Sequence, residues 1–412
     1  MTPRRVLLAL LSPLGAAGCG GAPARAAGDA AAEPHPGVVT RLDGRTLTHD
    51  QVSATVERLM AAGRVPGLAL AILNRGEIVF QRAFGYRDVE RRLPLTDTTV
   101  MYAASFTKSM FAYMVMQLAE EGAIDLDRPV EAHLRKPLPQ YPGYADLARD
   151  ARYRRITPRM LLSHTSGFRN WRFFSPAGAL DTTGTLDIHF DPGTRYSYSG
   201  EGIQLLQLVV EEVTGRSTAE LMRERVFDRF GMARTSMLWE PRFAGDVANG
   251  YDEQGTSLGH RQRRSVRAAG SVDSDLTDVA RFARGVLRGE GLRPETRAAM
   301  LSPQIRINST FQFPTPPTDT TDRDATIGLA YGLGWGLLES PYGRAYFKEG
   351  HDDGTENYMI AFDGPKTAIV IMTNSSNGES IFTELLATLI GDTFTPSAWE
   401  RYVPYDQAAA AP

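Results

Sequence analysis

The chain carries Ala103-Ala104-Ser105-Phe106-Thr107-Lys108-Ser109-Met110-Phe111, in which a lysine follows a serine by three residues. Lysine is rare in this protein, because only four of the 45 basic residues are Lys: Lys108, Lys136, Lys348 and Lys366. An ammonium can lose its proton at a workable pH and a guanidinium cannot, so a retained lysine indicates chemistry. The apolar neighbours of Lys108 lower the pKa of its amine by desolvation. The stretch therefore predicts a general base beside a nucleophilic hydroxyl.

The residues that follow this pair predict a helix over 106–121, with Gly122 as its stop. Ser105 then lies at the start of the helix, and Lys108 shares its face. Free backbone N–H groups at a helix start favour developing negative charge, so the nucleophile arrives with part of an oxyanion hole. The alternative is that Ser105 only caps the helix and Lys108 keeps its charge in solvent.

The composition is that of a soluble globular protein. The chain has 412 residues, of which 42% are hydrophobic and 23% charged. This length allows one large domain or two interleaved ones. A net charge of -3 argues against nucleic acid as a partner.

The periodicity of apolar residues predicts strands near both ends of the chain and helices between them. The expected helices are 51–62, 106–121, 203–213, 276–287 and 380–390, and the expected strands are 67–73, 78–84, 332–338, 344–348, 358–362 and 367–373. This order predicts an α/β fold in which both chain ends build one antiparallel sheet flanked by helices. A mostly helical subdomain is inserted at about 123–300. The domain spans 41–395, residues 304–326 form a long exposed loop that could act as a lid, and 396–412 form a tail.

Two later segments complete a pattern with Ser105 and Lys108. The first is 191–200, which contains Tyr196 and Tyr198, and the second is 347–354, which contains Lys348, Gly350 and His351. In this order the motifs resemble those of the serine β-lactamase and penicillin-binding-protein superfamily. The most similar branch is the class C-like one, which includes esterases and D-amino-acid peptidases. The resemblance covers about 45–395 and extends to the phrases at 161–167, 268–270 and 331–335.

The resemblance implies a role for each motif residue. Ser105 is the acylated nucleophile, Lys108 takes its proton, and Tyr198 rather than Tyr196 shuttles a proton to the leaving group. The backbone N–H of Ser105 and one from the strand near Tyr358 hold the oxyanion. In the third motif, Lys348 or His351, with Gly350 between them, faces the substrate or Tyr198, and His351 is preferred.

Two departures from the family pattern bear on the substrate. Gly200 stands where the tyrosine motif normally ends in Asn, and Glu349 stands where a Ser or Thr is usual. Both positions serve recognition of a β-lactam, and neither serves acyl transfer. The predicted function is therefore an exported serine hydrolase that cleaves a small ester, amide or peptide, as esterases or D-amino-acid peptidases do. A β-lactamase and a non-catalytic cell-wall-binding lipoprotein are the alternatives.

No cofactor or metal is expected. His164, His189 and His351 could supply metal ligands, but the chain has no His-Glu-x-x-His motif. His164 belongs to a loop that is structural in the family.

The N-terminus predicts export. Arg4 and Arg5 precede the apolar run 6–14, which is too short to span a membrane, so residues 1–18 read as a signal peptide. Residues 16–19 resemble a bacterial lipoprotein cleavage box, which implies a lipid anchor at Cys19. A plain cut after Ala24 or Ala26 is the alternative. Residues 19–40 read as a tether, and the protein is expected in the periplasm or anchored to a membrane.

Overall fold

The computed structural model describes residues 37–174 and 180–407. The expected signal peptide at 1–18, the lipidation site Cys19 and the tether up to residue 36 lie outside the described residues. Residues 408–412, the end of the expected tail, also lie outside them. Within the described residues, no helix combines the length and the apolar character needed to cross a bilayer.

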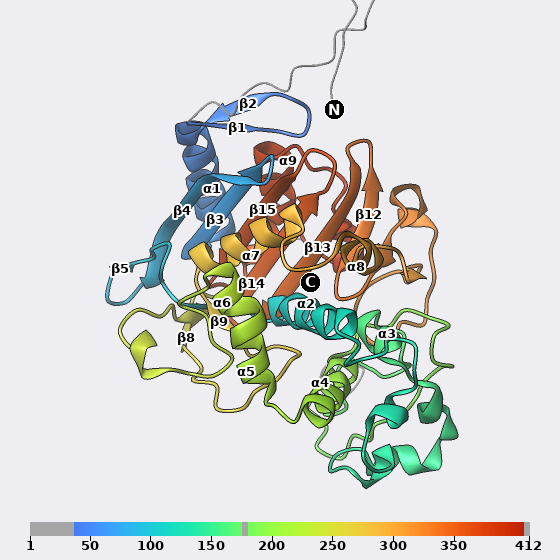
Figure 1. The fold of residues 1–412 in the computed structure, drawn as a ribbon. Helices are drawn as coiled ribbons and strands as arrows, with labels where there is room; N and C mark the ends of the chain where they lie inside the picture. Colours follow the sequence, from blue (N-terminus) through green and yellow to red (C-terminus); the bar gives the residue numbers. More distant parts are fainter. Residues whose placement is uncertain (1–36, 175–179, 408–412) are drawn as a thin grey trace, which may run out of the picture. The chain divides into compact units, whose positions relative to one another are not determined.

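The centre of the fold is a nine-stranded antiparallel sheet (Figure 1). In spatial order its strands are β10 (Ile305–Arg306), β11 (Ala330–Tyr331), β12 (Gly336–Ser340), β13 (Gly343–Asp352), β14 (Thr355–Phe362), β15 (Thr367–Thr373), β3 (Gly67–Asn74), β4 (Glu77–Asp88) and β5 (Leu93–Pro94). The late strand β15 pairs with the early strand β3, with Ile371 opposite Leu70. Both chain ends therefore build one sheet, and the expected fold is confirmed.

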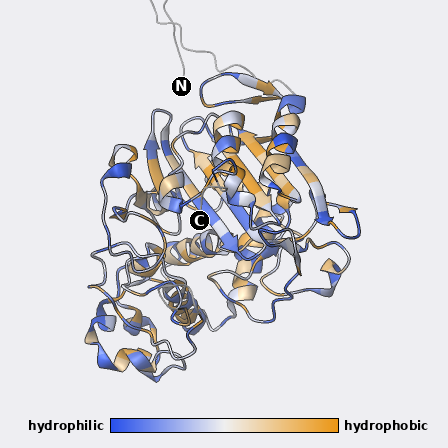
Figure 2. Cartoon of the chain, turned by 180° about the vertical axis from the view of Figure 1, so that it is seen from behind, coloured by the Kyte–Doolittle hydropathy of each residue, from blue (hydrophilic) through white to orange (hydrophobic). Residues whose placement is uncertain are grey.

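Both faces of the sheet are covered, which explains why its central strands are apolar along their whole length. All eight residues of β3 are buried. Leu68, Leu70 and Ile72 point into one core, whereas Ala69 and Ala71 point into the other. Figure 2 shows the same apolar character along the central strands.

Helices from different parts of the chain pack on the two faces. On one face, α1 (His49–Gly63) contacts α9 (Phe382–Leu389). On the other face, α7 (Leu276–Arg288) lies against β3, β4 and β15, and α2 (Phe106–Glu120) lies against β13. Nearly all of α2 is buried, as expected for a helix that is apolar all round. This placement brings the start of α2 to the sheet.

The inserted region at 123–300 is irregular rather than mainly helical. Its α-helices are α3 (Pro158–Leu162), α4 (Gly200–Thr214), α5 (Thr218–Met222), α6 (Asp228–Phe230), α7 and α8 (Pro294–Met300). Four short 3₁₀ turns lie between Val130 and Arg155. Small two-stranded ladders join β6 (Met101–Tyr102) to β9 (Asp273–Ser274) and β7 (Gly250–Tyr251) to β8 (Ser257–Gly259).

Three expectations from the sequence differ from the structure. The expected strand 332–338 is interrupted by a turn, because Gly332 N–H donates to the Trp335 carbonyl. The expected loop 304–326 is exposed over much of its length, but its middle also packs inward, where Gln312 and Thr315 are buried. The expected tail is ordered up to residue 407, where α10 (Ser397–Glu400) buries Trp399 completely.

Candidate active site

Ser105 sits on the turn that leads into α2. The preceding residue, Ala104, has φ of 45°, a left-handed conformation that costs energy for a residue with a Cβ and is often found at functional sites. The side chain of Ser105 makes no capping hydrogen bond to the helix. The hydroxyl is therefore free for another partner, and the alternative of a simple helix cap does not describe this serine.

That partner is Lys108. Its Nζ lies 2.8 Å from the Oγ of Ser105 and donates a hydrogen bond of 2.5 Å to the carbonyl of Ala269. The lysine is 2% exposed. Burial lowers the pKa of Lys108 well below its usual 10.5, and the charge of Lys348 lowers it further, while Glu349 opposes both. This lowered pKa favours the neutral amine, which is the form that can accept a proton.

Tyr198 lies between two lysines. The Nζ of Lys348 donates to the Tyr198 hydroxyl over 3.0 Å. The Nζ atoms of Lys108 and Lys348 lie 4.9 Å and 4.8 Å from the centre of the tyrosine ring. Burial raises the pKa of Tyr198 well above 10, and Glu349 raises it further, so the phenol keeps its proton. Tyr196 packs on Tyr331 instead, and its hydroxyl has no partner among the described residues.

The free edge of β13 supplies the third motif. β12 pairs with β13 only from Gly336–Phe347 to Ser340–Gly343, so no strand of the described residues covers that side of β13 from Lys348 onward. Lys348 is fully buried, and its Nζ also lies 2.5 Å from Oε1 of Glu349. Gly350 lies close to the nucleophile turn, because a Cβ there would be 2.9 Å from the Ala103 carbonyl.

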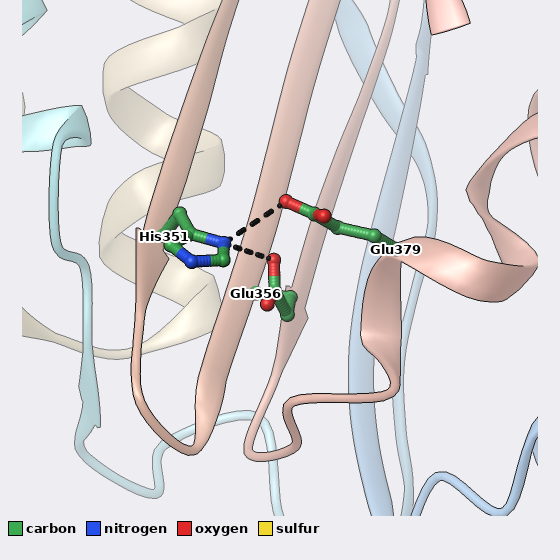
Figure 3. A group of neighbouring side chains, drawn as sticks. All are labelled: His351, Glu356 and Glu379. Atoms are coloured by element: carbon green, nitrogen blue, oxygen red, sulfur yellow. Dashed lines mark hydrogen bonds and ion pairs between the residues drawn. The ribbon is translucent and has the colours of Figure 1, made fainter. Parts of the chain in front are cut away.

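His351 faces a different set of residues (Figure 3). Its Nδ1 lies 2.8 Å from a carboxylate oxygen of Glu356, its partner across the hairpin, and 3.1 Å from one of Glu379. Burial opposes protonation of the ring, but hydrogen bonds to the two carboxylates raise its pKa to about 11. The preference for the His351 imidazole over Lys348 is therefore corrected: the structure brings Lys348, and not that ring, to Tyr198.

The expected oxyanion donor on the Tyr358 strand also needs correction. Tyr358 lies on β14, which has neighbours on both sides and pairs Tyr358 with Glu349 and Ile371. Its backbone is committed to the ladder. The Ser105 N–H, in contrast, makes no backbone hydrogen bond within the described part of the chain. Among the described strands, the edge of β13 that β12 leaves uncovered offers further backbone N–H groups near this turn.

His164 supports Tyr198 from behind. The imidazole is buried, its ring centre lies 4.4 Å from that of Tyr198, and its Nδ1 accepts a hydrogen bond of 3.1 Å from the Ser199 N–H. Burial lowers the pKa of His164 well below 6.5, and the nearby lysines add to this effect. A neutral imidazole that accepts from the backbone fixes the tyrosine turn, which agrees with the structural role expected for this loop.

The family model described as Beta-lactamase matches residues 52–389. The chain belongs to the Beta-lactamase family. The recognition of the superfamily from three motifs is confirmed, and membership classes the chain with the serine hydrolases.

Two curated relatives and one solved structure show how similar the members are. A D-aminopeptidase of Gluconobacter oxydans is 31% identical over 351 residues, which are 84% of this chain and 63% of the relative. Penicillin-binding protein 4 of Amycolatopsis lactamdurans is 28% identical over 86% of this chain and 94% of its own. The octameric penicillin-binding protein homologue from Pyrococcus abyssi shares the fold with a TM-score of 0.65, at 24% identity over 84% of this chain and 78% of its own.

Trp171 fills the space beside Gly200, the position where the tyrosine motif of the family normally carries an asparagine. A Cβ on Gly200 would lie 2.5 Å from the indole of Trp171, so this ring occupies the volume a side chain would need. Trp171 stacks on Phe173 at 5.3 Å. The neighbouring Glu201 is not available as a substitute polar contact, because Arg172 binds its carboxylate at 2.6 Å.

Sequence reasoning also missed the partners of the third motif. The carboxylate of Glu349 binds Lys348 and accepts a hydrogen bond of 3.1 Å from Gln312, a buried residue of the loop 304–326. Phe313 on the same loop packs edge-on against Tyr198 at 5.4 Å. In the sequence, the only sign of this pair is that Glu349 directly follows Lys348, one of the four lysines. No residue spacing predicts that Gln312 of the loop 304–326 reaches them.

Proposed function

We propose that the protein is a serine hydrolase that cleaves an amide or ester of a small peptide-like substrate through an acyl-enzyme on Ser105. The observation that carries the proposal is the buried Lys108 amine 2.8 Å from the Ser105 hydroxyl. A neutral amine at this distance can take the hydroxyl proton as the oxygen attacks a carbonyl carbon. Burial supplies the neutral amine, which an exposed lysine would not offer at neutral pH.

The negative charge on the attacked oxygen needs two donors. One is the Ser105 N–H at the start of α2, where the helix dipole also favours an anion. The other follows from the alternation of an antiparallel strand, in which the N–H and C=O of one residue point to the same side. The Glu349 carbonyl accepts from the Lys348 side chain, so it points to the free edge. The N–H of His351, two residues on, then points to that edge as well.

The leaving group needs a proton, and Tyr198 is placed to give it. Its phenol remains protonated, and the cation of Lys348 lies 3.0 Å from its oxygen, where it stabilises any negative charge that develops. The proton on Lys108 then returns through the phenol. A water molecule then hydrolyses the acyl-enzyme. It loses a proton to Lys108 or Tyr198 as it attacks the ester carbonyl, and the acid product leaves as the Ser105 hydroxyl takes that proton back.

The substrate class is narrowed by Trp171. A β-lactamase of this family would present an asparagine amide at position 200, whereas the indole of Trp171 fills that place here. The family relative that the chain matches at 31% identity is a D-aminopeptidase. An amide or ester of a D-amino acid is therefore the favoured substrate, ahead of a β-lactam.

We also propose that the protein is exported and anchored through Cys19. The support is the sequence of the N-terminus alone: two arginines, the apolar run 6–14 and the small residues before the cysteine. Metabolic labelling with a radioactive fatty acid tests the proposal. Label in the wild type that disappears in Cys19→Ala is expected, and unlabelled wild type would reject the anchor.

The hydrolase proposal is tested with chromogenic substrates. Purified protein is assayed with p-nitrophenyl esters, D- and L-alanine p-nitroanilides and a chromogenic cephalosporin. Ser105→Ala should abolish turnover of every substrate that the wild type accepts. Ser109→Ala is the matched control, because its hydroxyl lies one turn further along α2 and binds the Gly334 carbonyl instead. Equal activity in wild type and Ser105→Ala would reject the nucleophile.

A further inference from the structure

Phe313 places an exposed aromatic ring beside Tyr198. The two rings meet edge to face with their centres 5.4 Å apart, and 36% of Phe313 is exposed. The other side chains that lie close to the tyrosine ring, Lys108, Lys348 and His164, are all buried. Of these four neighbours, Phe313 alone meets solvent.

The exposed ring is anchored by the residues on both sides of it. The Gln312 N–H donates a hydrogen bond of 3.0 Å to the Trp399 carbonyl, and the Gln312 side chain donates to Glu349. After the ring, the Thr315 hydroxyl accepts a hydrogen bond of 2.7 Å from the Asn170 N–H. Gln312 and Thr315 are both buried. The ring therefore belongs to a fixed stretch of the loop and not to a free loop tip.

An apolar ring held in water is stabilised when another apolar group covers it. Single exposed apolar side chains are common on protein surfaces and need no special explanation. Phe313 differs from these because it touches the residue that the proposed mechanism uses to protonate the leaving group. A group that covers its exposed part therefore lies next to the reacting atoms.

The direction of the chemistry indicates which part of the substrate that is. When the bond between the carbonyl carbon and the leaving oxygen or nitrogen breaks, the proton of the Tyr198 phenol passes to the leaving atom. The leaving atom must then lie within hydrogen-bond distance of the phenol oxygen. A side group that begins one or two bonds beyond this atom reaches the Phe313 ring, which packs against the tyrosine. The acyl part of the substrate, in contrast, stays on Ser105.

We propose that Phe313 binds an apolar group on the leaving side of the substrate. The protein then prefers esters and amides whose alcohol or amine carries an aromatic or branched aliphatic group. This inference rests on the proposed function and narrows its substrate class on the side of the scissile bond that leaves. Phe313 determines specificity and takes no part in the proton transfers.

The experiment compares D-alanine benzyl ester with D-alanine methyl ester, which form the same acyl-enzyme on Ser105 and differ only in the leaving alcohol. The value of kcat/KM, which reports the free energy of the transition state relative to free enzyme and ester, is measured for wild type, Phe313→Ala and Phe311→Ala. Phe311 is the matched control, because it lies on the same loop and its ring faces the guanidinium of Arg401 instead.

The wild type should favour the benzyl ester about 5- to 20-fold after correction for the rates of the two esters with hydroxide, the effect expected from covering the exposed third of a phenyl ring. Phe313→Ala should lose this preference because its kcat/KM for the benzyl ester falls. Its kcat/KM for the methyl ester should stay at the wild-type value. Phe311→Ala should keep the preference.

The outcomes separate this inference from the proposed function. If the wild type hydrolyses both esters with equal corrected kcat/KM, or if Phe313→Ala keeps the wild-type ratio, the leaving-group site is overturned while the serine hydrolase stands. An equal fall for both esters in Phe313→Ala would also overturn it, because the ring would then only hold Tyr198 in place. If neither ester is hydrolysed, both proposals fall.

A second variant keeps the test decisive where Phe313→Ala does not fold. Phe313→Leu retains an apolar side chain of similar reach but smaller area, so it should keep part of the preference for the benzyl ester. A ratio in Phe313→Leu equal to or above that of the wild type would overturn the inference.

Discussion

Replacing Lys108 with methionine should abolish activity and change how the stability of the fold depends on pH. Methionine has a similar length but no nitrogen, so the Ser105 hydroxyl loses its base. General bases contribute about 10²- to 10⁴-fold to a rate, so the rate of acylation should fall by at least that factor. Loss of activity alone would not show that the amine is neutral, but the pH dependence of stability does.

The sign of that dependence follows from the lowered pKa of Lys108. Its folded-state pKa is well below 10.5, the value expected in the unfolded chain. Between these two values the unfolded chain binds one proton more than the folded chain. The free energy of unfolding therefore rises with pH across this window by about 1.4 kcal/mol per pH unit. It levels off above 10.5 and below the folded-state pKa.

Chemical denaturation at steps of half a pH unit from 7 to 10.5 measures this slope. The wild type should show a free energy of unfolding that rises with pH. In Lys108→Met the slope should be smaller by about 1.4 kcal/mol per pH unit, which is the contribution of one proton. Lys366→Met is the matched control, because Lys366 is one of the four lysines and its side chain is 39% exposed beside Asp363. Identical slopes in the wild type and Lys108→Met would refute the neutral amine. Lys108→Met also loses the hydrogen bond to the Ala269 carbonyl. That loss lowers the free energy of unfolding by the same amount at every pH, so it does not change the slope.

Three further changes test the surroundings of the site. Lys348→Met should lower the free energy of unfolding by about 3–5 kcal/mol, because it leaves the buried Glu349 carboxylate without its cation; unchanged melting would contradict the buried pair. His351→Ala should keep kcat within about threefold, since the imidazole contacts the carboxylates of Glu356 and Glu379. The protonated ring stabilises the fold fully below pH 6.5, and this stabilisation is lost as the pH rises toward about 11. The variant should lack this pH-dependent part of the free energy of unfolding. Gly200→Asn should cost about 1–3 kcal/mol and give no β-lactam turnover, because its side chain meets Trp171; a stable, β-lactam-hydrolysing variant would show that the indole moves freely.

The sequence allowed the sheet and the nucleophile to be predicted because both depend on local patterns. Ser105 and Lys108 share a helix turn, so their spacing alone brings them together. β3 and β15 are apolar along their length, which indicates strands buried on both faces. The pairing of the two chain ends then followed from the order of the elements.

The third motif could not be assigned because its register depends on where β12 ends. Lys348 and His351 are three residues apart, so they point to opposite faces of β13. Which one meets Tyr198 depends on which face of β13 packs against α2, and the sequence does not show that face. Trp171 and Gln312 were missed for a related reason: each reaches the site from a loop whose path is fixed by tertiary packing.

The central claim is that a neutral Lys108 removes the proton of Ser105. It is tested most directly by the rate at which a fluorophosphonate modifies the protein at different pH values, with the modified residue located by mass spectrometry. We predict an adduct on Ser105 whose rate of formation rises with pH along a single ionisation well below 10.5 and falls at least 100-fold in Lys108→Met. An adduct on another residue, or equal rates in the two proteins, would contradict the claim.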